Sequence, residues 1–265
     1  MAHFTGLVLA CVLGSAASMA QSPGFLGPQP DGWSAAQAVE SEAAISPMQL
    51  AKNVLHDQKP IWTLPEKAAR GKHWKPVLAV VLGTAGLVVI DPYIEAYFHD
   101  QSRFSAYKTG PLRGRNTTLA ETLTPVAFYV AGLTKHSSHA RNTGLLAAEG
   151  LIGAQIVSFV MKQAAGRLKP SDIPPNGSLR DTWFKYKGGL ANGGGFPSGH
   201  SASAFAVATV ISERYREHRW IPWVAYGAAA VLSLSRLPNQ AHFPSDIFIG
   251  AAMGYSISHF VVLRK

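Results

Sequence analysis

Hydrophobic residues along the chain gather into six long segments separated by polar, glycine-rich or proline-rich stretches. Each segment is long enough for a helix, and none alternates apolar and polar residues with the two-residue period of a strand. Small residues (Ala, Gly and Ser) occur throughout, which allows helices to approach one another closely. The pattern predicts an all-α protein whose core is a single six-helix bundle. The segments cover residues 76–90, 118–134, 142–162, 199–213, 220–234 and 246–263.

The start of the chain has a different character from the rest. No charged side chain precedes Asp31, and residues 4–20 are apolar and end in Ser-Met-Ala, a sequence that resembles a signal-peptidase site. Residues 1–20 are therefore predicted to be a signal peptide. An uncleaved membrane anchor is the alternative, because the positively charged region that usually opens a signal peptide is missing.

Residues 21–75 are interrupted repeatedly by proline, so this leader has room for short helices only. One such helix is predicted from Pro47 to about Gln58, with Ser46 as its N-cap and Pro47 at its first position. The helical domain proper is expected to occupy residues 76–265.

Composition narrows the class of protein. Of the 265 residues 47% are hydrophobic and 15% are charged, which excludes a disordered chain. The single cysteine, Cys11, excludes a disulfide framework and a cysteine-based metal site. The formal net charge of +9 indicates an anionic partner. Nucleic acid is not expected, because the cations lie between apolar runs and form no single stripe.

Three short polar blocks stand at the ends of the predicted helices: residues 162–170, 195–200 and 235–246. In an up-and-down bundle, the end of the third helix and the start of the fourth lie at the same end. The end of the fifth helix and the start of the sixth join them there. Connectivity alone therefore predicts that the three blocks meet at one end of the bundle.

The residue types in these blocks suit the binding of phosphate. If the third helix continues through Lys169, then Lys162 and Lys169 lie seven residues apart on nearly one face and clamp an anion. Ser198 and Gly199 open a helix, where free N–H groups and the helix dipole favour phosphate.

A histidine and a carboxylate stand four residues apart in the third block. Proline is common at the first position of a helix, so Pro244 is predicted to begin one. Asp246 then falls in the first turn and is expected to reach back to His242. A carboxylate on one ring nitrogen fixes the tautomer and makes the other nitrogen a better nucleophile.

Together the blocks resemble the signature of the type 2 phosphatidic acid phosphatase superfamily, which also includes bacterial acid phosphatases and vanadium haloperoxidases. That signature reads Lys, six residues, Arg-Pro; then Pro-Ser-Gly-His; then Ser-Arg, five residues, His, three residues, Asp. The second and third blocks match it in full. The first departs from it, because Lys169 stands where the family has arginine.

The resemblance implies roles for the matching residues. His242 would attack phosphorus and form a phosphohistidine, Asp246 would orient it, and His200 would protonate the leaving oxygen. No metal or other cofactor is implied, because cationic side chains supply the positive charge. Arg167 is an additional candidate for phosphate binding, with a salt bridge to Asp172 or Asp181 as the alternative. The implied phosphate-binding residues are Lys162, Lys169, Ser198, Gly199 and Arg236.

The resemblance also implies an activity, a metal-independent hydrolysis of phosphate monoesters or diphosphates, most naturally those of lipids in the cell envelope. A soluble periplasmic acid phosphatase of broad specificity is the main alternative. A vanadium haloperoxidase and an inactive bundle that binds phosphate or lipid are further alternatives. The residues leave the particular phosphate ester and the oligomeric state open.

Charges bear on the orientation of the bundle. Nine Lys or Arg residues and two Glu residues cluster at the end opposite the blocks, which by the positive-inside rule is cytoplasmic. An export signal followed by six full spans would instead place the blocks inside. Either residues 1–20 are no export signal, or segment 76–90 does not span, or the bundle is soluble and periplasmic. We favour a membrane-associated protein whose active site faces outward.

Overall fold

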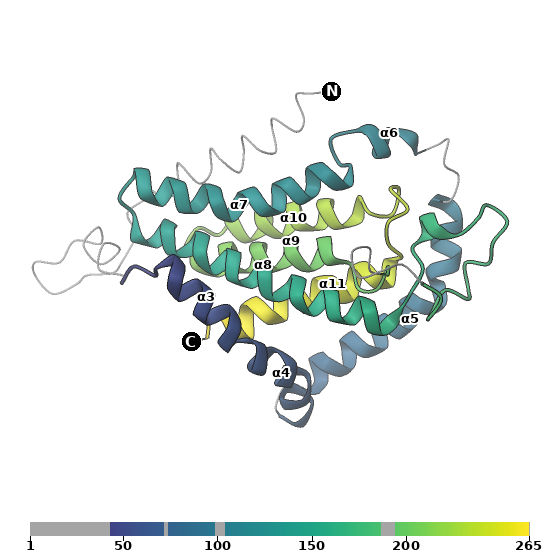
Figure 1. Cartoon of the computed structure of the whole chain (residues 1–265), viewed down its shortest axis with the longest axis horizontal. Coiled ribbons are helices and arrows are strands. Elements are labelled where there is room, and N and C mark those ends of the chain that lie inside the picture. Colours follow the sequence, from purple (N-terminus) through teal and green to yellow (C-terminus); the bar gives the residue numbers. More distant parts are fainter. Residues whose placement is uncertain (1–42, 72–73, 99–103, 187–193, 265) are drawn as a thin grey trace, which may run out of the picture.

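A computed structural model describes residues 43–71, 74–98, 104–186 and 194–264, and no strand occurs among them. The described residues form helices joined by loops (Figure 1), which confirms the prediction of an all-α protein. The predicted signal segment, residues 1–20, lies outside the described residues.

Every one of the six predicted apolar segments is helical, and they correspond to α5, α7, α8, α9, α10 and α11. A 3₁₀ turn, Pro170–Asp172, follows α8, and a π-helical turn, Ser258–Val262, extends α11. The helices are α3 (Pro47–His56), α4 (Gln58–Arg70), α5 (Trp74–Phe98), α6 (Ser105–Thr109), α7 (Gly114–Thr134), α8 (Ser138–Ala165), α9 (Gly199–Arg214), α10 (Ile221–Leu234) and α11 (Pro244–Ile257).

Two leader helices lie against the bundle near its carboxyl-terminal end (Figure 1). The first, α3, begins at Pro47 as expected, and the Oγ of Ser46 accepts a hydrogen bond of 3.1 Å from the backbone N–H of Gln49. The second, α4, is a separate helix that the sequence does not predict, and it tolerates Pro65 in its interior. Its Ile61 reaches the core, so this helix packs with the bundle.

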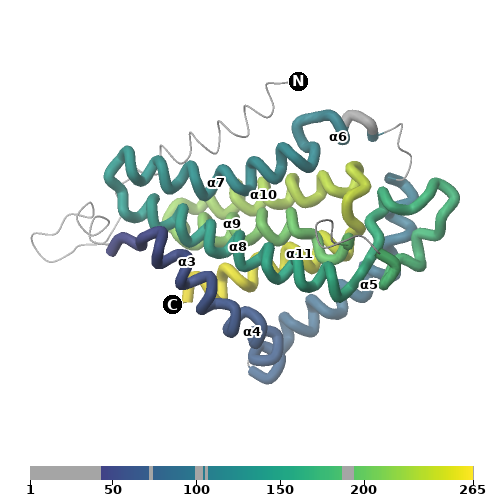
Figure 2. The backbone as a smooth tube through the Cα atoms, in the orientation of Figure 1, coloured from purple at the N-terminus to yellow at the C-terminus, as the bar shows by residue number. Residues whose placement is uncertain are grey.

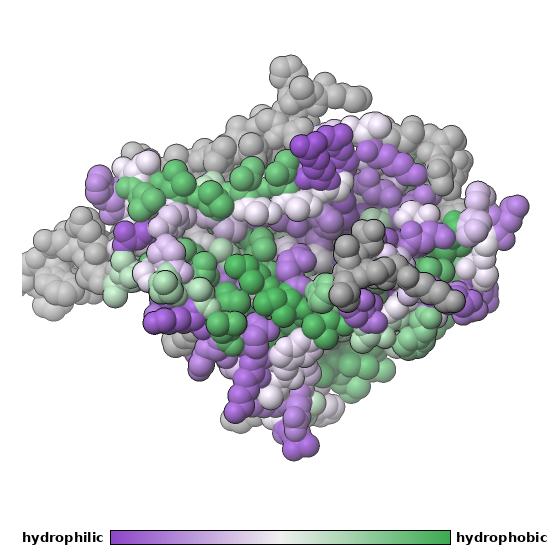
Figure 3. All heavy atoms as spheres, viewed as in Figure 1, coloured by the Kyte–Doolittle hydropathy of each residue, from purple (hydrophilic) through white to green (hydrophobic). Residues whose placement is uncertain are grey.

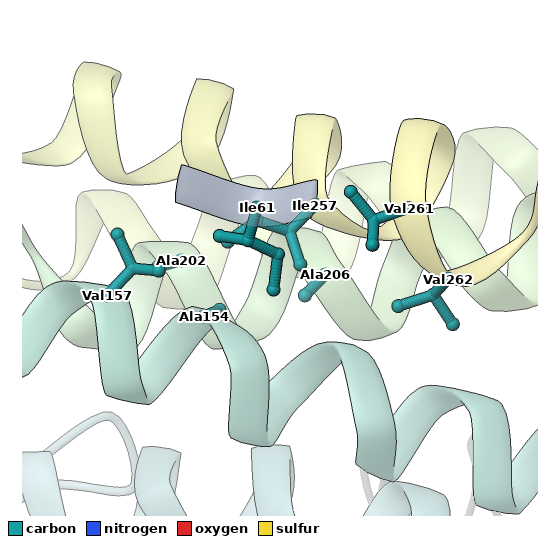
Figure 4. Packing of buried hydrophobic residues seen from close by; sticks show 8 residues of the cluster. All are labelled: Ile61, Ala154, Val157, Ala202, Ala206, Ile257, Val261 and Val262. Atoms are coloured by element: carbon teal, nitrogen blue, oxygen red, sulfur yellow. The ribbon is translucent and has the colours of Figure 1, made fainter. Parts of the chain in front are cut away.

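The core surrounds α9, which contacts α8, α10 and α11. Figure 4 shows part of it, where small and branched side chains from α4, α8, α9, α11 and the π-helical turn meet. The backbones of α9 and α11 touch, because a Cβ on Gly254 would lie 2.0 Å from the carbonyl oxygen of Ala202. This close contact fixes the position of α11 and, with it, of the loop that precedes α11.

The helix α5 lies at the edge of the bundle against α11 and α4, and it runs to Phe98, well past the predicted end at residue 90. Of its residues, all of them described, only Asp91 and Glu95 are buried. The prediction ended at the first charge. The helix continues because Asp91 is neutralised from inside the bundle by Arg167.

Large apolar side chains are exposed along the outer helices, and green patches on the visible face reflect this (Figure 3). Three helical segments are long and apolar enough to cross a membrane: Trp74–Phe98, Ser138–Asp172 and Pro244–Val262. The outward apolar residues include Leu82 and Val89 on α5, Leu123 and Val130 on α7, and Trp223 and Val231 on α10.

Candidate active site

The three polar blocks meet at one end of the bundle, where the smooth trace brings the loop after α8, the start of α9 and the loop before α11 together (Figure 2). Hydrogen bonds join the blocks directly. The backbone N–H of Gly195 donates to the carbonyl of Arg167 at 2.6 Å, and the N–H of Ser198 donates to the carbonyl of Asp246 at 2.9 Å.

His242 lies buried in the loop before α11, and its Nδ1 is 2.7 Å from the carbonyl oxygen of Gly195. A carbonyl only accepts hydrogen bonds, so Nδ1 carries the proton and Nε2 keeps a free lone pair. Burial lowers the pKa of His242 well below its usual value, and the positive charges of Lys162 and Lys169 lower it further. The imidazole is therefore neutral at pH 7, with Nε2 as the potential nucleophile.

Asp246 does not hydrogen-bond the imidazole, which corrects the sequence-based expectation. Its Oδ2 lies 3.8 Å from Nδ1 of His242 and instead accepts from the backbone N–H of Phe243 at 2.8 Å. Its Oδ1 accepts from Nη1 of Arg167 at 2.6 Å. The carboxylate faces the start of α11, where the N–H of Phe243 and the positive end of the helix dipole favour a negative charge. Asp246 therefore fixes the backbone next to His242.

Arg167 lies in the interior with 2% of its surface exposed, and its guanidinium bonds only to protein groups. Its Nη2 pairs with Asp91 at 2.7 Å and its Nη1 with Asp246, and neither of the expected partners, Asp172 or Asp181, is involved. The guanidinium plane is stacked against the rings of Trp183 and Phe243, at 4.5 Å and 4.1 Å.

Within the first block, helix α8 ends earlier than predicted. α8 ends at Ala165 because Gly166 adopts the left-handed conformation (φ 49°), which ends helices readily when the residue is glycine. Lys162 is therefore on the helix, whereas Lys169 is in the loop, 5.9 Å from the centroid of the Tyr186 ring. The expectation of one helical face is wrong, although both cations act on His242 electrostatically.

The second block opens α9. Ser198 is the N-cap, and its Oγ accepts from the backbone N–H of Ser201 at 3.3 Å. A Cβ on Gly199 would lie 3.6 Å from Nζ of Lys162, so this helix start and the lysine face the same space. An anion in that space meets an ammonium group and the positive end of a helix dipole together.

His200 follows on the first turn of α9, with its Nε2 at 3.0 Å from Oγ1 of Thr118. Burial lowers the pKa of His200 to about 3, and the nearby charges of Arg236 and His242 add to this effect. A bound phosphate anion would compensate the charge of Arg236 and raise the pKa of His200 again.

Arg236 closes the site from the loop after α10, where it is 1% exposed. Its Nη2 donates to Oγ of Ser235 at 2.9 Å and to the carbonyl of Leu112. Its Nη1 donates neither of these bonds and lies 3.2 Å from where a Cβ on Gly114 would be. The start of α7 thus approaches the guanidinium closely, and a side chain at position 114 would be in tight contact with it.

Several residues around the site cannot be found from the motifs. Thr118 and Gly114 come from α7, Ser245 from α11, and Asp91 and Glu95 from α5. The one signal for the last two was an acid pair in an otherwise apolar helix, a pattern that marks functional positions in membrane helices. Among the described residues, no group of three His, Cys, Asp or Glu suited to a metal ion occurs.

The sequence model of the PAP2 superfamily matches residues 143–264, which include all three blocks. This stretch of the chain is similar to the PAP2 superfamily. The relatives that it resembles are named lipid A phosphatases. The lipid A 4'-phosphatase of Porphyromonas gingivalis is 32% identical over 111 residues, which are 42% of this chain and 45% of that protein.

Two further relatives show the same extent of similarity. The lipid A 4'-phosphatase of Bacteroides thetaiotaomicron is 30% identical over 117 residues, 42% of this chain and 51% of that protein. The lipid A 1-phosphatase of Rhizobium etli is 34% identical over 103 residues, 37% of this chain and 40% of that protein. The chain thus spans about half, or less, of the length of these relatives. No solved structure is significantly similar to it.

Proposed function

We propose that the protein is a phosphatase that hydrolyses a lipid phosphate through a phosphohistidine intermediate. One observation carries the proposal: the neutral imidazole of His242 presents Nε2 in a space that Lys162, Lys169 and Arg236 make positive. A buried nucleophile beside several cations suits attack on a phosphorus atom whose oxygens carry negative charge.

The reaction is proposed to proceed in two displacements. In the first, Nε2 of His242 attacks phosphorus, the bond to the leaving oxygen breaks, and His200 gives its proton to that oxygen. In the second, His200 takes a proton from water, the water attacks phosphorus, and the bond to Nε2 breaks to release inorganic phosphate. The ammonium groups, the start of α9 and Arg236 hold the non-bridging oxygens throughout.

A lipid substrate is supported by two independent observations. The similar proteins are named lipid A 1- and 4'-phosphatases, and exposed apolar side chains cover α5, α7 and α10. A surface of this kind is stable in contact with acyl chains and costly in water. The proposed setting is the cell envelope, with the active site facing outward, because the opposite end carries cations such as Arg141, Arg214 and Arg264.

Phosphate release from a panel of esters tests the proposal. The full chain in detergent micelles is given lipid A, phosphatidate, phosphatidylglycerophosphate, isoprenyl diphosphate and a small aryl phosphate. We expect turnover of at least one lipid phosphate by the wild type and none by His242→Ala. The matched control is His56→Ala, which removes an exposed histidine from α3. Undiminished turnover by His242→Ala would exclude the mechanism, and turnover of the aryl phosphate alone would favour the soluble acid phosphatase.

A further inference from the structure

Two acids on α5 face the catalytic end of the bundle, and they are the only side chains that this helix buries. Asp91 accepts from Nη2 of Arg167 at 2.7 Å and from the backbone N–H of Ser245 at 3.0 Å, and it also accepts from the Ser245 hydroxyl. Neither carboxyl oxygen of Glu95 has a hydrogen-bond partner among the described residues. A helix that carries no part of the family signature, α5, therefore contacts the residues around the site.

Arg167 connects Asp91 to the nucleophile by two routes. Through its side chain, Nη1 bonds to Asp246, whose other oxygen holds the backbone N–H of Phe243, directly after His242. Through its backbone, the carbonyl of Arg167 accepts from the N–H of Gly195 at 2.6 Å, and the carbonyl of Gly195 accepts from Nδ1 of His242.

The second route depends on a very close approach of two loop segments. A Cβ on Gly194 would lie 2.7 Å from the carbonyl oxygen of Arg167 and 3.0 Å from its nitrogen. Any displacement of Arg167 therefore moves the backbone that carries the Gly195 carbonyl. That carbonyl is the group that selects the tautomer of His242.

Each of the three nitrogens of the Arg167 guanidinium donates to the protein, and Nη1 does so twice. Nε donates to Oγ1 of Thr182 at 3.2 Å, Nη1 to Ser245 and Asp246, and Nη2 to Asp91. Because every nitrogen already donates to the protein, the guanidinium has no pair of free N–H groups with which to bind two oxygens of a phosphate. Its influence on the reaction must therefore pass through its neighbours.

We propose that Arg167 is a positioning residue that holds His242 in its attacking orientation, and that Asp91 of α5 anchors Arg167 for this purpose. The proposal rests on the proposed function, in which His242 is the nucleophile. Buried ion pairs of this kind contribute little net stability and serve better to impose one arrangement on the groups around them. Here the arrangement imposed is that of the His242 ring.

Steady-state kinetics separate positioning from phosphate binding. Arg167→Lys and Asp91→Asn should each lower kcat by roughly 10- to 100-fold, because a small misplacement of a nucleophile has effects of that order. KM and the inhibition constant of inorganic phosphate should change less than about 2-fold, since no phosphate contact is removed. A residue that binds phosphate would instead raise both constants, and that result would overturn the proposal.

Arg180→Ala is the matched control for these variants. Arg180 also joins the loop after α8 to α5, with its Nη2 2.9 Å from the hydroxyl of Tyr93, but Arg180 is exposed whereas Arg167 is buried. Its kcat should equal that of the wild type. The double variant Asp91→Asn/Arg167→Lys should lose no more than the worse single variant, because both act on one pathway. Additive losses would show that Asp91 does not act through Arg167.

A third, milder variant tests the proposal even if Arg167→Lys and Asp91→Asn fail to fold. Ser245→Ala removes one hydroxyl that bonds both Arg167 and Asp91, and leaves every charge in place. It should lower kcat by a smaller factor, about 3- to 10-fold, with the same unchanged KM. An unchanged kcat in Ser245→Ala together with unfolding of the other two variants would mean that the network serves stability alone.

The tautomer of His242 gives a readout that needs no turnover. In protein labelled with ¹⁵N-histidine, the His242 ring should show the Nδ1–H form in the wild type and a mixture of tautomers in Arg167→Lys. The missing signal in His242→Gln assigns it. A wild type without phosphatase activity would overturn the proposed function and leave this test standing. An active wild type whose tautomer is identical in Arg167→Lys would overturn the positioning role alone.

Discussion

His242 depends for its orientation on a backbone group, the carbonyl of Gly195. The proton on Nδ1 points at that carbonyl, so the lone pair on Nε2 is presented without a carboxylate in contact. Asp246, the residue that the motif suggests for orienting the ring, bonds instead to the backbone N–H of Phe243, next to His242. The availability of Nε2 for attack therefore depends on the backbone conformation of the loop that contains Gly195.

Gly195→Ala should impair catalysis because a Cβ there would lie 3.0 Å from the carbonyl oxygen of Leu168 and 3.5 Å from Oδ2 of Asp246. Either the loop or the carboxylate must shift, and the carbonyl under His242 shifts with it. We expect kcat to fall by roughly 10- to 100-fold. The control is Gly86→Ala, which adds a methyl group with nothing within 4 Å. Wild-type turnover in Gly195→Ala would contradict the role of this carbonyl.

Lys169 keeps the positive charge of the family arginine and gives up its planar fork. Lys169→Ala should cost about 1.5 to 3 kcal/mol of transition-state stabilisation, roughly 10- to 200-fold in kcat/KM. Lys169→Arg should retain activity, because the loop position leaves room for a longer side chain. Lys185→Ala, a lysine of the same loop paired with Asp181, is the control. Equal rates in Lys169→Ala and wild type would remove Lys169 from the site.

At the scale of elements, the sequence predicts the six apolar helices well because each is defined by a long run of small and branched residues. It misses α4, whose prolines suggested a break. It also ends the segment of α5 at residue 90, because the charge of Asp91 in an apolar run looked like a boundary. The charge of Asp91 can be buried because Arg167, 76 residues further along the chain, neutralises it. No local pattern contains that information.

The candidate site divides in the same way. Residues that stand in motifs, such as Ser198 and His200, lie at the helix ends where connectivity predicts them. Asp91 and Thr118 could not be predicted, because they come from helices outside the motifs and meet the site only through tertiary packing. The end of α8 at Gly166 was also missed, because helix termination there depends on a left-handed glycine inside a favourable run.

The contact between α9 and α11 gives a prediction at this scale. Gly254→Ala should lower the free energy of unfolding by at least about 2 kcal/mol, because its Cβ would lie 2.0 Å from the carbonyl oxygen of Ala202. Gly227→Ala on α10, with nothing within 4 Å, should be neutral or stabilising by up to about 1 kcal/mol. Denaturant unfolding in detergent measures both. Similar stabilities for the two variants would mean that α11 can shift away from α9 at little cost.

For the whole molecule, stability should depend on pH through the buried histidines. Folding lowers the pKa of His200 to about 3, and an unfolded histidine has a pKa near 6.5. Between these values the unfolded chain binds a proton that the folded chain does not. The free energy of unfolding should therefore fall as the pH falls below about 6.5, by up to about 1.4 kcal/mol per pH unit for each such histidine.

Unfolding measured at pH 7 and at pH 4.5 checks this dependence. His242, whose pKa is also lowered, adds to the loss of stability in acid. His200→Gln should lose less stability on acidification than the wild type, whereas His56→Gln, which changes an exposed histidine, should lose as much. Equal losses in all three proteins would mean that the pKa of His200 is the same in the folded and the unfolded chain.

The two buried acids of α5 have a consequence for how the protein must be handled. Hydrogen bonds from Asp91 join the helix to its neighbours, while its apolar side chains, Leu82 and Val89 among them, face outward. Removing lipid and detergent exposes those side chains to water and favours detachment or self-association of α5. We expect delipidation to inactivate the protein reversibly, since Arg167 loses its anchor while the catalytic residues stay in place. If activity returns when lipid is added back, the activity depends on the lipid that surrounds α5.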